Sequence, residues 1–268
     1  ALEIDPRNVA VLENKGNFLL SLEEYDEAIM CFERALENDP NEVSVWDALG
    51  DAFYFSGRFK DALRCRDRAL EIDANNADRW ANKGAVLNDM GKCEEAMRCC
   101  NRSLEMDPRN PLAWFLRGVI LTTTGLQTSN VDKLHKGIEC LDNALKCEPP
   151  NSVDVWVWKG IVLDGLGRYE DALKCFQKAL LIESNHFLAW HSRGNSLFKL
   201  EKYSEAMDCY EKALRINPKS ADAWYNKGLT LALLGRRREA FECVNKCLEC
   251  NPDSEVAKQL REALLKSQ

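Results

Sequence analysis

Histidine is scarce in this sequence, and the short motifs of common catalytic and nucleotide-binding sites are missing. Only three histidines occur, and none forms a motif with a serine, cysteine or aspartate. No GxxxxGK[ST] phosphate-binding loop is present. Carboxylates are numerous, but we expect them mainly on solvated helix faces beside basic neighbours. The sequence therefore predicts a protein that is not an enzyme and uses no cofactor.

Long apolar runs are absent as well. No stretch approaches the roughly 20 apolar residues that a membrane-spanning helix needs, and the chain does not open with a basic segment followed by an apolar one. From these absences we expect a soluble, cytoplasmic protein that has no membrane partner.

Positive charge is in deficit. The 268 residues include 36 lysines and arginines against 43 aspartates and glutamates, which gives a net charge of −7. A nucleic-acid-binding surface needs an excess of basic residues, so no nucleic-acid partner is expected. Because like charges repel during encounter, a protein partner with basic and apolar residues fits better.

What the sequence has in plenty is an internal repeat. Tryptophans recur every 34 residues in two series, Trp46, Trp80 and Trp114, then Trp156, Trp190 and Trp224. A glycine follows each of them by four residues, and most units end before a proline, which disfavours the helical conformation in the residue before it. Each unit is therefore predicted to be two helices joined by a tight turn. The turns are expected at Gly57, Gly91, Gly125, Gly167 and Gly235.

The pattern Trp46-x-x-Leu49-Gly50-x-x-Phe53, followed by an alanine at 62, resembles the tetratricopeptide repeat. The resemblance covers essentially the whole chain and implies an all-α fold, a right-handed superhelical solenoid of antiparallel helix pairs. We expect seven units at 9–42, 43–76, 77–110, 111–152, 153–186, 187–220 and 221–254. Residues 1–8 match the end of a preceding repeat. Residues 255–268 are predicted to form a capping helix, because an unstacked terminal repeat would leave its apolar side in water.

The fourth unit carries seven extra residues between its helices, within 122–136. Ser129 and Asp132 resemble a capping box, so its second helix is predicted to begin near Asn130. The threonine-rich stretch at 122–128 is then expected to be a loop. That loop is either a binding edge or a neutral surface insertion, and both interpretations stay open.

The resemblance also implies a binding surface, because in this family the first helix of each unit lines the inner surface of the superhelix. Carried over residue by residue, it predicts polar contacts in the N-terminal part at Asn14, Asn17, Asp47, Asp51 and Asn82. The middle is apolar, with Phe115, Leu116, Val119, Trp158 and Ile161. The C-terminal part adds His191, Asn195, Tyr225 and Asn226. The expected ligand is an extended or helical segment of another protein.

Trp158 is the one tryptophan that does not stand four residues before a glycine. Its predicted place on the inner surface would expose it, and tryptophan is enriched at binding hot spots. Alternatively, Trp158 packs against Leu116 as additional core. Asn14, Asn82 and Asn226 share one inner position, where an amide can hold a peptide backbone through paired hydrogen bonds.

Twelve cysteines are present, and seven recur at one position of the second helix: Cys31, Cys65, Cys99, Cys140, Cys175, Cys209 and Cys243. Equivalent positions of stacked helices lie roughly 10 Å apart, beyond the reach of a disulfide. We therefore expect small packed side chains and a reducing compartment. The alternative is a metal bound by Cys243, Cys247 and Cys250. The lack of a suitably spaced histidine argues against it.

Basic residues stand just before most of the repeated glycines. Their stems are expected to cover apolar surface while their charged ends meet carboxylates of the neighbouring unit. A ladder that binds phosphate groups is the alternative. These residues are Lys15, Lys83, Arg117, Lys159, Arg193 and Lys227.

Taken together, these patterns predict a non-catalytic protein–protein interaction scaffold that binds a peptide or a helical segment in a concave groove. Two other hypotheses stay open. One is a structural array that self-associates through its ends, since residues 1–4 would expose an apolar half-repeat. The other is the targeting arm of a larger multidomain enzyme.

Overall fold

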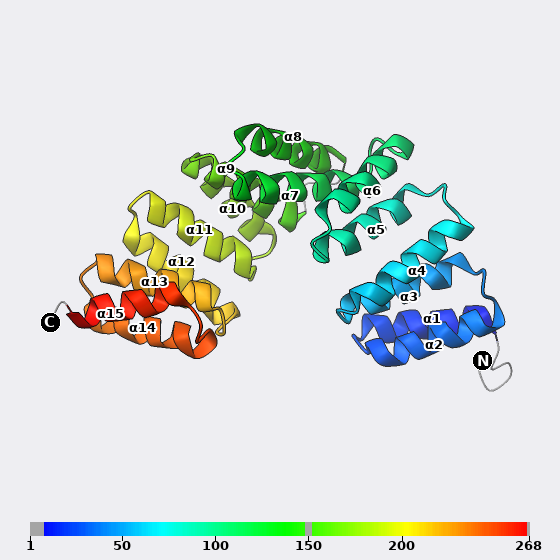
Figure 1. Ribbon diagram of the computed structural model, residues 1–268, viewed down its shortest axis with the longest axis horizontal. Helices are drawn as coiled ribbons and strands as arrows, with labels where there is room; N and C mark the ends of the chain where they lie inside the picture. The colour runs from blue at the N-terminus through cyan, green and yellow to red at the C-terminus, as the bar shows by residue number, and fades with distance from the viewer. Residues whose placement is uncertain (1–7, 148–151, 267–268) are drawn as a thin grey trace. The chain divides into compact units, whose positions relative to one another are not determined.

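Helices make up the regular structure of this protein. A computed structural model describes residues 8–147 and 152–266, and over those residues it contains fifteen α-helices and no strand (Figure 1). The expected all-α fold is confirmed. In chain order the helices are α1 (Val9–Ser21), α2 (Tyr25–Asn38), α3 (Val43–Phe55), α4 (Phe59–Ile72), α5 (Ala77–Asp89), α6 (Cys93–Met106), α7 (Pro111–Gln127), α8 (Val131–Cys147), α9 (Val153–Gly165), α10 (Tyr169–Ile182), α11 (Phe187–Lys199), α12 (Tyr203–Ile216), α13 (Ala221–Leu233), α14 (Arg237–Cys250) and α15 (Glu255–Lys266).

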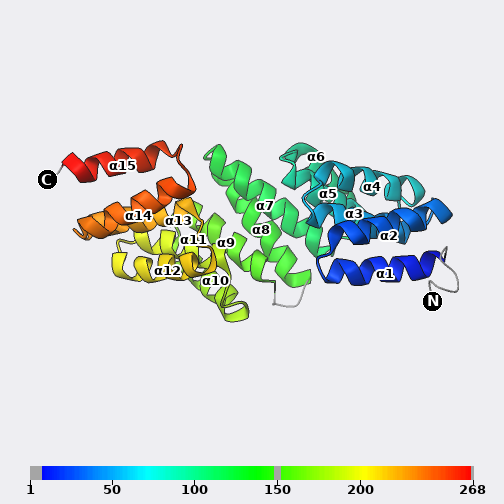
Figure 2. The same cartoon turned by 90° about the horizontal axis from the view of Figure 1, so that it is seen from below.

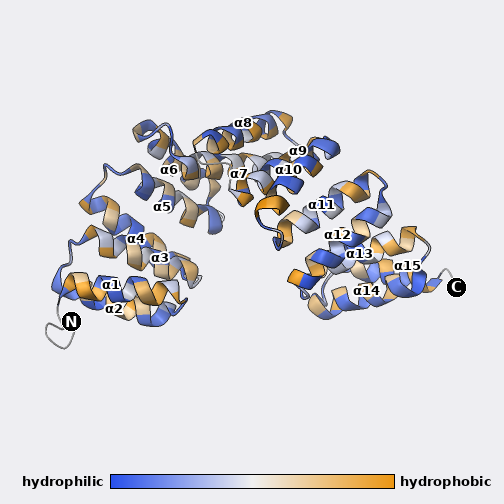
Figure 3. Ribbon diagram, turned by 180° about the vertical axis from the view of Figure 1, so that it is seen from behind, coloured by the Kyte–Doolittle hydropathy of each residue, from blue (hydrophilic) through white to orange (hydrophobic). Residues whose placement is uncertain are grey.

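Successive helices form hairpins, from α1 with α2 to α13 with α14, and α15 follows the last of them (Figure 2). Within each of these seven repeats the first helix is the A helix and the second is the B helix. Apolar and polar residues are interleaved along the helices (Figure 3), as expected where one face of a helix packs on its neighbours and the other meets water.

The turn between the A and B helices needs a residue in the left-handed region. Glycine supplies it in four repeats, at Gly57, Gly91, Gly167 and Gly235, with φ between 74° and 77°. In repeats 1 and 6 a glutamate adopts this conformation instead. Since L-residues other than glycine reach it only with strain, the glycine turn was the easier one to predict from the sequence.

The fourth repeat differs from its prediction. Its seven extra residues lengthen both helices, because α7 and α8 each have 17 residues, whereas α9 has 13 and α10 has 14. The predicted loop at 122–128 and the predicted turn at Gly125 are therefore wrong, since α7 continues to Gln127. Asn130 caps α8 by accepting a hydrogen bond from the Lys133 amide at 3.0 Å, while Ser129 lies in the turn with φ 50°.

The chain divides into two compact units. Unit 1 comprises residues 1–120 and 142–147, and unit 2 comprises residues 121–141 and 148–268. In unit 2, α15 packs on α13 and α14, and Ala257 is buried there in a cluster with Val244 and Cys247. The predicted remnant at residues 1–8 lies outside the described residues apart from Asn8, whose side chain caps α1.

Candidate binding surfaces

In repeat 2, two acids of the A helix reach a buried guanidinium. Arg66 of α4 is only 3% exposed, because it fills the space opposite Gly50, where an added Cβ would lie 3.1 Å from the guanidinium carbon. Its Nη1 donates to the carbonyl oxygen of Asp47 at 3.0 Å, and its Nη2 donates to the Asp51 carboxylate. A buried cation needs such partners, since desolvating it alone is costly. Asp47 and Asp51, both predicted to contact a ligand, therefore bind the protein's own arginine.

The same network continues into repeat 3. Nε of Arg79 on α5 donates to Oδ2 of Asp47 at 2.7 Å, and its Nη1 donates to Asp73 at 2.5 Å. The backbone amide of Asn75 and the Arg79 side chain both lower the pKa of Asp73 by hydrogen bonding to its carboxylate. The two acids among the polar contacts predicted for this part of the chain are thus neutralised by internal ion pairs.

In repeat 6, the corresponding residues form a neutral hydrogen-bonded cluster. Asn195 Oδ1 accepts from the hydroxyl of Tyr210 at 3.0 Å and from Nδ2 of Asn226 at 3.0 Å. The same Nδ2 lies 3.1 Å from Nε2 of His191. Burial lowers the pKa of His191, and the Asp222 carboxylate opposes this only in part. The imidazole is therefore neutral near pH 7, which leaves Nε2 free to accept from Asn226.

A small cavity of about 230 Å³ opens beside this cluster, and its lining comes from α11, α12 and α13 of unit 2. Polar and apolar groups share the wall, which is typical of sites that bind a side chain and orient it. Among the described residues, neither Nδ2 of Asn195 nor Oδ1 of Asn226 makes a hydrogen bond. The lining residues are Asn195, Phe198, Lys199, Tyr210, Asn226 and Leu229.

Four other predicted polar contacts are not among the residues that line this cavity. Asn14 and Asn17 of α1 are exposed, whereas Asn82 of α5 is half-buried. Tyr225 is half-buried and packs against the cluster around Val244 in α14. These four residues remain predicted contacts, and the cavity draws only Asn195 and Asn226 from the predicted set.

The predicted apolar centre needs correction at two residues. Leu116 and Val119 are 5% and 6% exposed, so their side chains are core and offer almost no surface to a partner. Phe115, Trp158 and Ile161 are half-buried, and Trp158 is thus less exposed than the sequence suggested. Phe115 belongs to unit 1, while Trp158 and Ile161 belong to unit 2, so a continuous apolar surface formed by all three stays a prediction.

Five of the six basic residues that precede the glycines lie over their repeat's own tryptophan. The sixth, Lys15, belongs to repeat 1, which has no tryptophan. Lys83 is 5.6 Å from the ring centroid of Trp80, and Arg193 is 5.5 Å from that of Trp190. A second lysine, from the B helix, covers each tryptophan ring of repeats 5 to 7 at 4.1–4.5 Å. The indole positions were evident from the sequence, but these cation–π contacts were not. Their signal was a basic residue 22 positions after the tryptophan in those three repeats.

Family models for the tetratricopeptide repeat match residues 8–75, 153–186 and 221–254, and a further TPR repeat model matches residues 194–235. The chain belongs to the tetratricopeptide repeat family. The predicted family is therefore confirmed. Residues 93–124 of this tetratricopeptide repeat protein also match a model of the protein prenyltransferase alpha subunit repeat. None of the curated proteins matches the sequence.

Solved structures share the tetratricopeptide repeat fold over long stretches. One chain of the APC/C hetero-tetramer Cut9–Hcn1 aligns with a TM-score of 0.81 at 18% identity, covering 98% of this chain and 50% of that one. This chain thus spans about half the length of that relative. A tetratricopeptide repeat protein from Parabacteroides merdae aligns at 0.69 and 18% identity, covering 96% and 98%. YrrB, described as having an unusual peptide-binding site, aligns at 0.55 and 23%, covering 74% and 97%. These identities support the fold alone.

The cysteines of these repeats pack mainly in the helix interfaces, since nine of the twelve are buried. Burial raises the pKa of Cys65 to about 12 and that of Cys209 to about 11. Cys247 and Cys250 have CxxC spacing, yet Cys247 is buried and its pKa is also raised by burial. Thiols held protonated in this way are poor nucleophiles and poor metal ligands.

The part of the chain that the structure describes contains neither a metal-ligand cluster nor a membrane-spanning helix. No group of three or more histidine, cysteine, aspartate or glutamate side chains is placed there to hold a metal ion. Within the same residues, none of the helices combines the length and the apolar character needed to cross a membrane.

Proposed function

We propose that this protein is a non-catalytic scaffold that binds a segment of a partner protein on the A-helix surface of its repeats. The cavity beside Asn195 and Asn226 is the observation that carries the proposal. It combines apolar walls with an amide N–H and an amide carbonyl that are not used internally, and these are the groups that hold a peptide backbone. Membership of the tetratricopeptide repeat family and the peptide-binding site named for YrrB support the same function.

The partner segment that fits this cavity is extended, because backbone groups must reach both amides. An apolar side chain of the partner would enter between Phe198 and Leu229, while its backbone pairs with Asn226. The net charge of −7 favours a partner with basic residues outside the cavity. With its many buried thiols, the protein fits a reducing compartment such as the cytoplasm.

Capture from cell lysate tests this proposal. The wild type is compared with a double variant, Asn226→Ala and Leu229→Ala, which leaves the Tyr210–Asn195 hydrogen bond in place. Loss of one polar and one apolar contact should weaken capture of the specific partner about tenfold or more. Asp208→Ala, at an exposed position of the B helix α12, is the matched control and should capture as the wild type does. Circular dichroism confirms the fold of all three proteins. Equal capture by the double variant and the wild type would refute binding at this cavity.

A further inference from the structure

In repeat 3, a lysine bridges a tryptophan ring and an acid of the preceding repeat. Nζ of Lys83 on α5 lies 5.6 Å from the ring centroid of Trp80 and 2.6 Å from Oδ1 of Asp67 on α4. The indole is fixed by a hydrogen bond from its Nε1 to the backbone oxygen of Ala74 at 3.0 Å. The lysine therefore closes the space between the B helices of repeats 2 and 3, over a rigid aromatic floor.

Repeat 7 contains the same arrangement. Lys227 on α13 lies 5.8 Å from the ring centroid of Trp224 and 3.0 Å from Oε1 of Glu211 on α12. In both repeats the lysine follows the tryptophan by three residues, and the acid stands at the same position of the preceding B helix. A cation held between an aromatic face and a carboxylate is thus a recurring element of this chain.

Repeat 2 has the tryptophan and the acid but not the lysine. Trp46 is fixed as in the other repeats, with Nε1 donating to the Pro40 oxygen at 2.9 Å. Glu33 of α2 stands at the position that Asp67 and Glu211 hold, and Leu49 replaces the lysine. Among residues 8–147 and 152–266, no cation lies over the Trp46 ring, and no ion pair involves Glu33.

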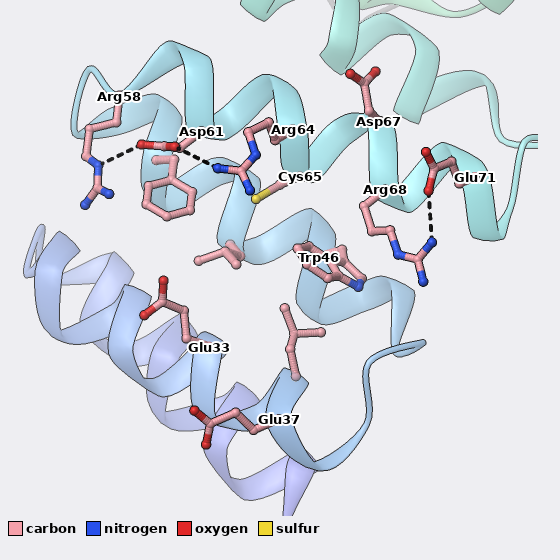
Figure 4. A pocket seen from close by; sticks show the side chains of 13 residues that line it. Glu33, Glu37, Trp46, Arg58, Asp61, Arg64, Cys65, Asp67, Arg68 and Glu71 are labelled. Atoms are coloured by element: carbon pink, nitrogen blue, oxygen red, sulfur yellow. Dashed lines mark hydrogen bonds and ion pairs between the residues drawn. The ribbon is translucent and has the colours of Figure 1, made fainter.

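Without that lysine, a groove of about 850 Å³ opens between α2 and α4 over α3, and we call it the B-helix groove. Trp46 of α3 lies at its floor, and Glu33 and Glu37 stand on its α2 wall (Figure 4). Leu49 and Phe53 also line the floor but are buried, and the Arg58 guanidinium lies 4.4 Å from the Phe53 ring centroid. The arginines of the α4 wall are paired within their own segment, for example Arg68 with Glu71 at 2.9 Å and Arg58 with Asp61 at 3.3 Å. Arg64, which is more exposed, pairs with Asp61 at 3.7 Å. Glu33 and Glu37 are therefore the charged residues of this groove that have no ion pair among the described residues.

We infer that the B-helix groove is a second binding site, which accepts a lysine or arginine side chain of a partner protein between Trp46 and Glu33. The partner's cation completes the arrangement that Lys83 and Lys227 complete in repeats 3 and 7. The groove is much larger than one ammonium group, so apolar residues beside the basic one in the partner pack on the half-buried Trp46 ring. A second copy of this chain fits less well, because two chains of net charge −7 repel each other.

This site is separate from the cavity in unit 2, so its test stands apart from the function proposed above. The probes are two synthetic helical peptides of the same length with a leucine-rich face and one central residue, lysine in the first and glutamate in the second. Fluorescence anisotropy should show binding of the lysine peptide about tenfold or more tighter than that of the glutamate peptide. Leu49→Lys, which supplies the missing cation from within, should weaken the lysine peptide's binding about tenfold.

Glu33→Gln keeps the core intact and should weaken binding of the lysine peptide severalfold. Asp26→Asn removes the same charge from an exposed position of α2 outside the groove and should change nothing. The inference is overturned if the two peptides bind alike, if neither binds, or if Glu33→Gln and Asp26→Asn have equal effects. Sedimentation velocity of the wild type alone gives a further check. Self-association that Leu49→Lys abolishes would assign the groove to a second copy and overturn the assignment to a partner protein.

Discussion

Repeats 2 and 6 solve one packing problem with different chemistry. In each, a B-helix side chain fills the space opposite the A-helix glycine. Arg66 bonds to the A-helix residues three positions before and one position after that glycine, whereas Tyr210 bonds only to the residue one position after it. The corresponding residues are Asp47, Asp51 and Arg66 in repeat 2 and His191, Asn195 and Tyr210 in repeat 6. Added Cβ atoms at Gly50 and Gly194 would lie 3.1 Å from Arg66 and 2.6 Å from Tyr210. The absence of a glycine side chain leaves the space, and the B-helix residue that fills it determines which A-helix groups it binds.

The difference determines which A-helix groups a partner can use. The guanidinium of Arg66 lies 3.4 Å from the Asp47 carboxylate and pairs with that of Asp51, and Arg79 also binds Asp47, so both charges serve the fold. The phenol of Tyr210 engages one oxygen of Asn195 and leaves its amide N–H open to the cavity. Polar residues at equivalent positions of a repeat array are therefore not equivalent as ligand contacts. The neighbouring B-helix residue determines whether they are bound within the protein or open to a ligand.

The largest predicted effect comes from removing the two carboxylates that pair with Arg66. Asp47→Asn combined with Asp51→Asn should destabilise unit 1 by about 3–5 kcal/mol, because a buried guanidinium loses its counter-charges. Hydrogen exchange followed by mass spectrometry over α3 and α4 measures this locally, which suits a repeat array whose unfolding need not be two-state. Unchanged exchange would mean that the acids do not support the fold and are available to a ligand, as the sequence suggested.

A transplant sharpens the same comparison. The triple variant Asp47→His, Asp51→Asn and Arg66→Tyr gives repeat 2 the three residues of repeat 6. The neutral cluster should recover at least half of the lost protection, since no buried charge then remains unpaired. No recovery at all would show that the two repeats differ in backbone geometry as well as in side chains.

The repeat length, the helix pairs and the family could be predicted from the sequence, because tryptophan and glycine recur at fixed intervals. Pairing across a repeat could not. Whether Asp47 meets a partner or Arg66 depends on where a long side chain of the next helix ends. The position of Arg66 has no counterpart of like chemistry in the other repeats, so periodicity gave no sign of the ion pair. The residues at that position are Phe32, Cys100, Leu141, Phe176, Tyr210 and Val244.

The fourth repeat misled for a different reason. The extra residues and the capping-box resemblance of Ser129 and Asp132 favoured a loop at 122–128. Packing prevailed: Thr122 and Gly125 are buried, and an added Cβ at Gly125 would lie 2.8 Å from Leu134 of α8. Leu116 was predicted as a surface contact for a related reason. A family map assigns a residue to a helix face but does not say how deeply the residue is buried.

A smaller effect on stability is expected from the lysine that covers Trp190 in repeat 6, compared with the arginine at the same position of repeat 2. Lys212 lies 4.1 Å from the ring centroid of Trp190 in unit 2, whereas Arg68, at the same position of repeat 2, pairs with Glu71. Lys212→Met keeps the apolar stem and should destabilise repeat 6 by about 0.5–1 kcal/mol. Arg68→Met should stay within about 0.5 kcal/mol of the wild type, because an exposed ion pair contributes little. Urea denaturation checks both, and equal losses would mean that the ring contact adds nothing.

The smallest predicted effect is a pH dependence confined to repeat 6. Burial lowers the pKa of His191 in the folded protein, so between that pKa and the unfolded value of about 6.5 the unfolded chain binds more protons. Stability of this repeat should therefore fall as the pH drops from about 7.5 through 6.5. Protonation also turns Nε2 into a donor that opposes Nδ2 of Asn226, which breaks their hydrogen bond.

His191→Gln supplies the comparison, because its amide oxygen can accept from Asn226 at any pH in this range. Hydrogen exchange over α11 and α13, corrected for the intrinsic effect of pH, should show wild-type protection falling between pH 7.5 and 5.5 while the variant's stays level. Repeat 2 should show no such change, because residues 43–76 contain no histidine. Parallel losses in wild type and variant would assign the pH dependence to a group other than His191.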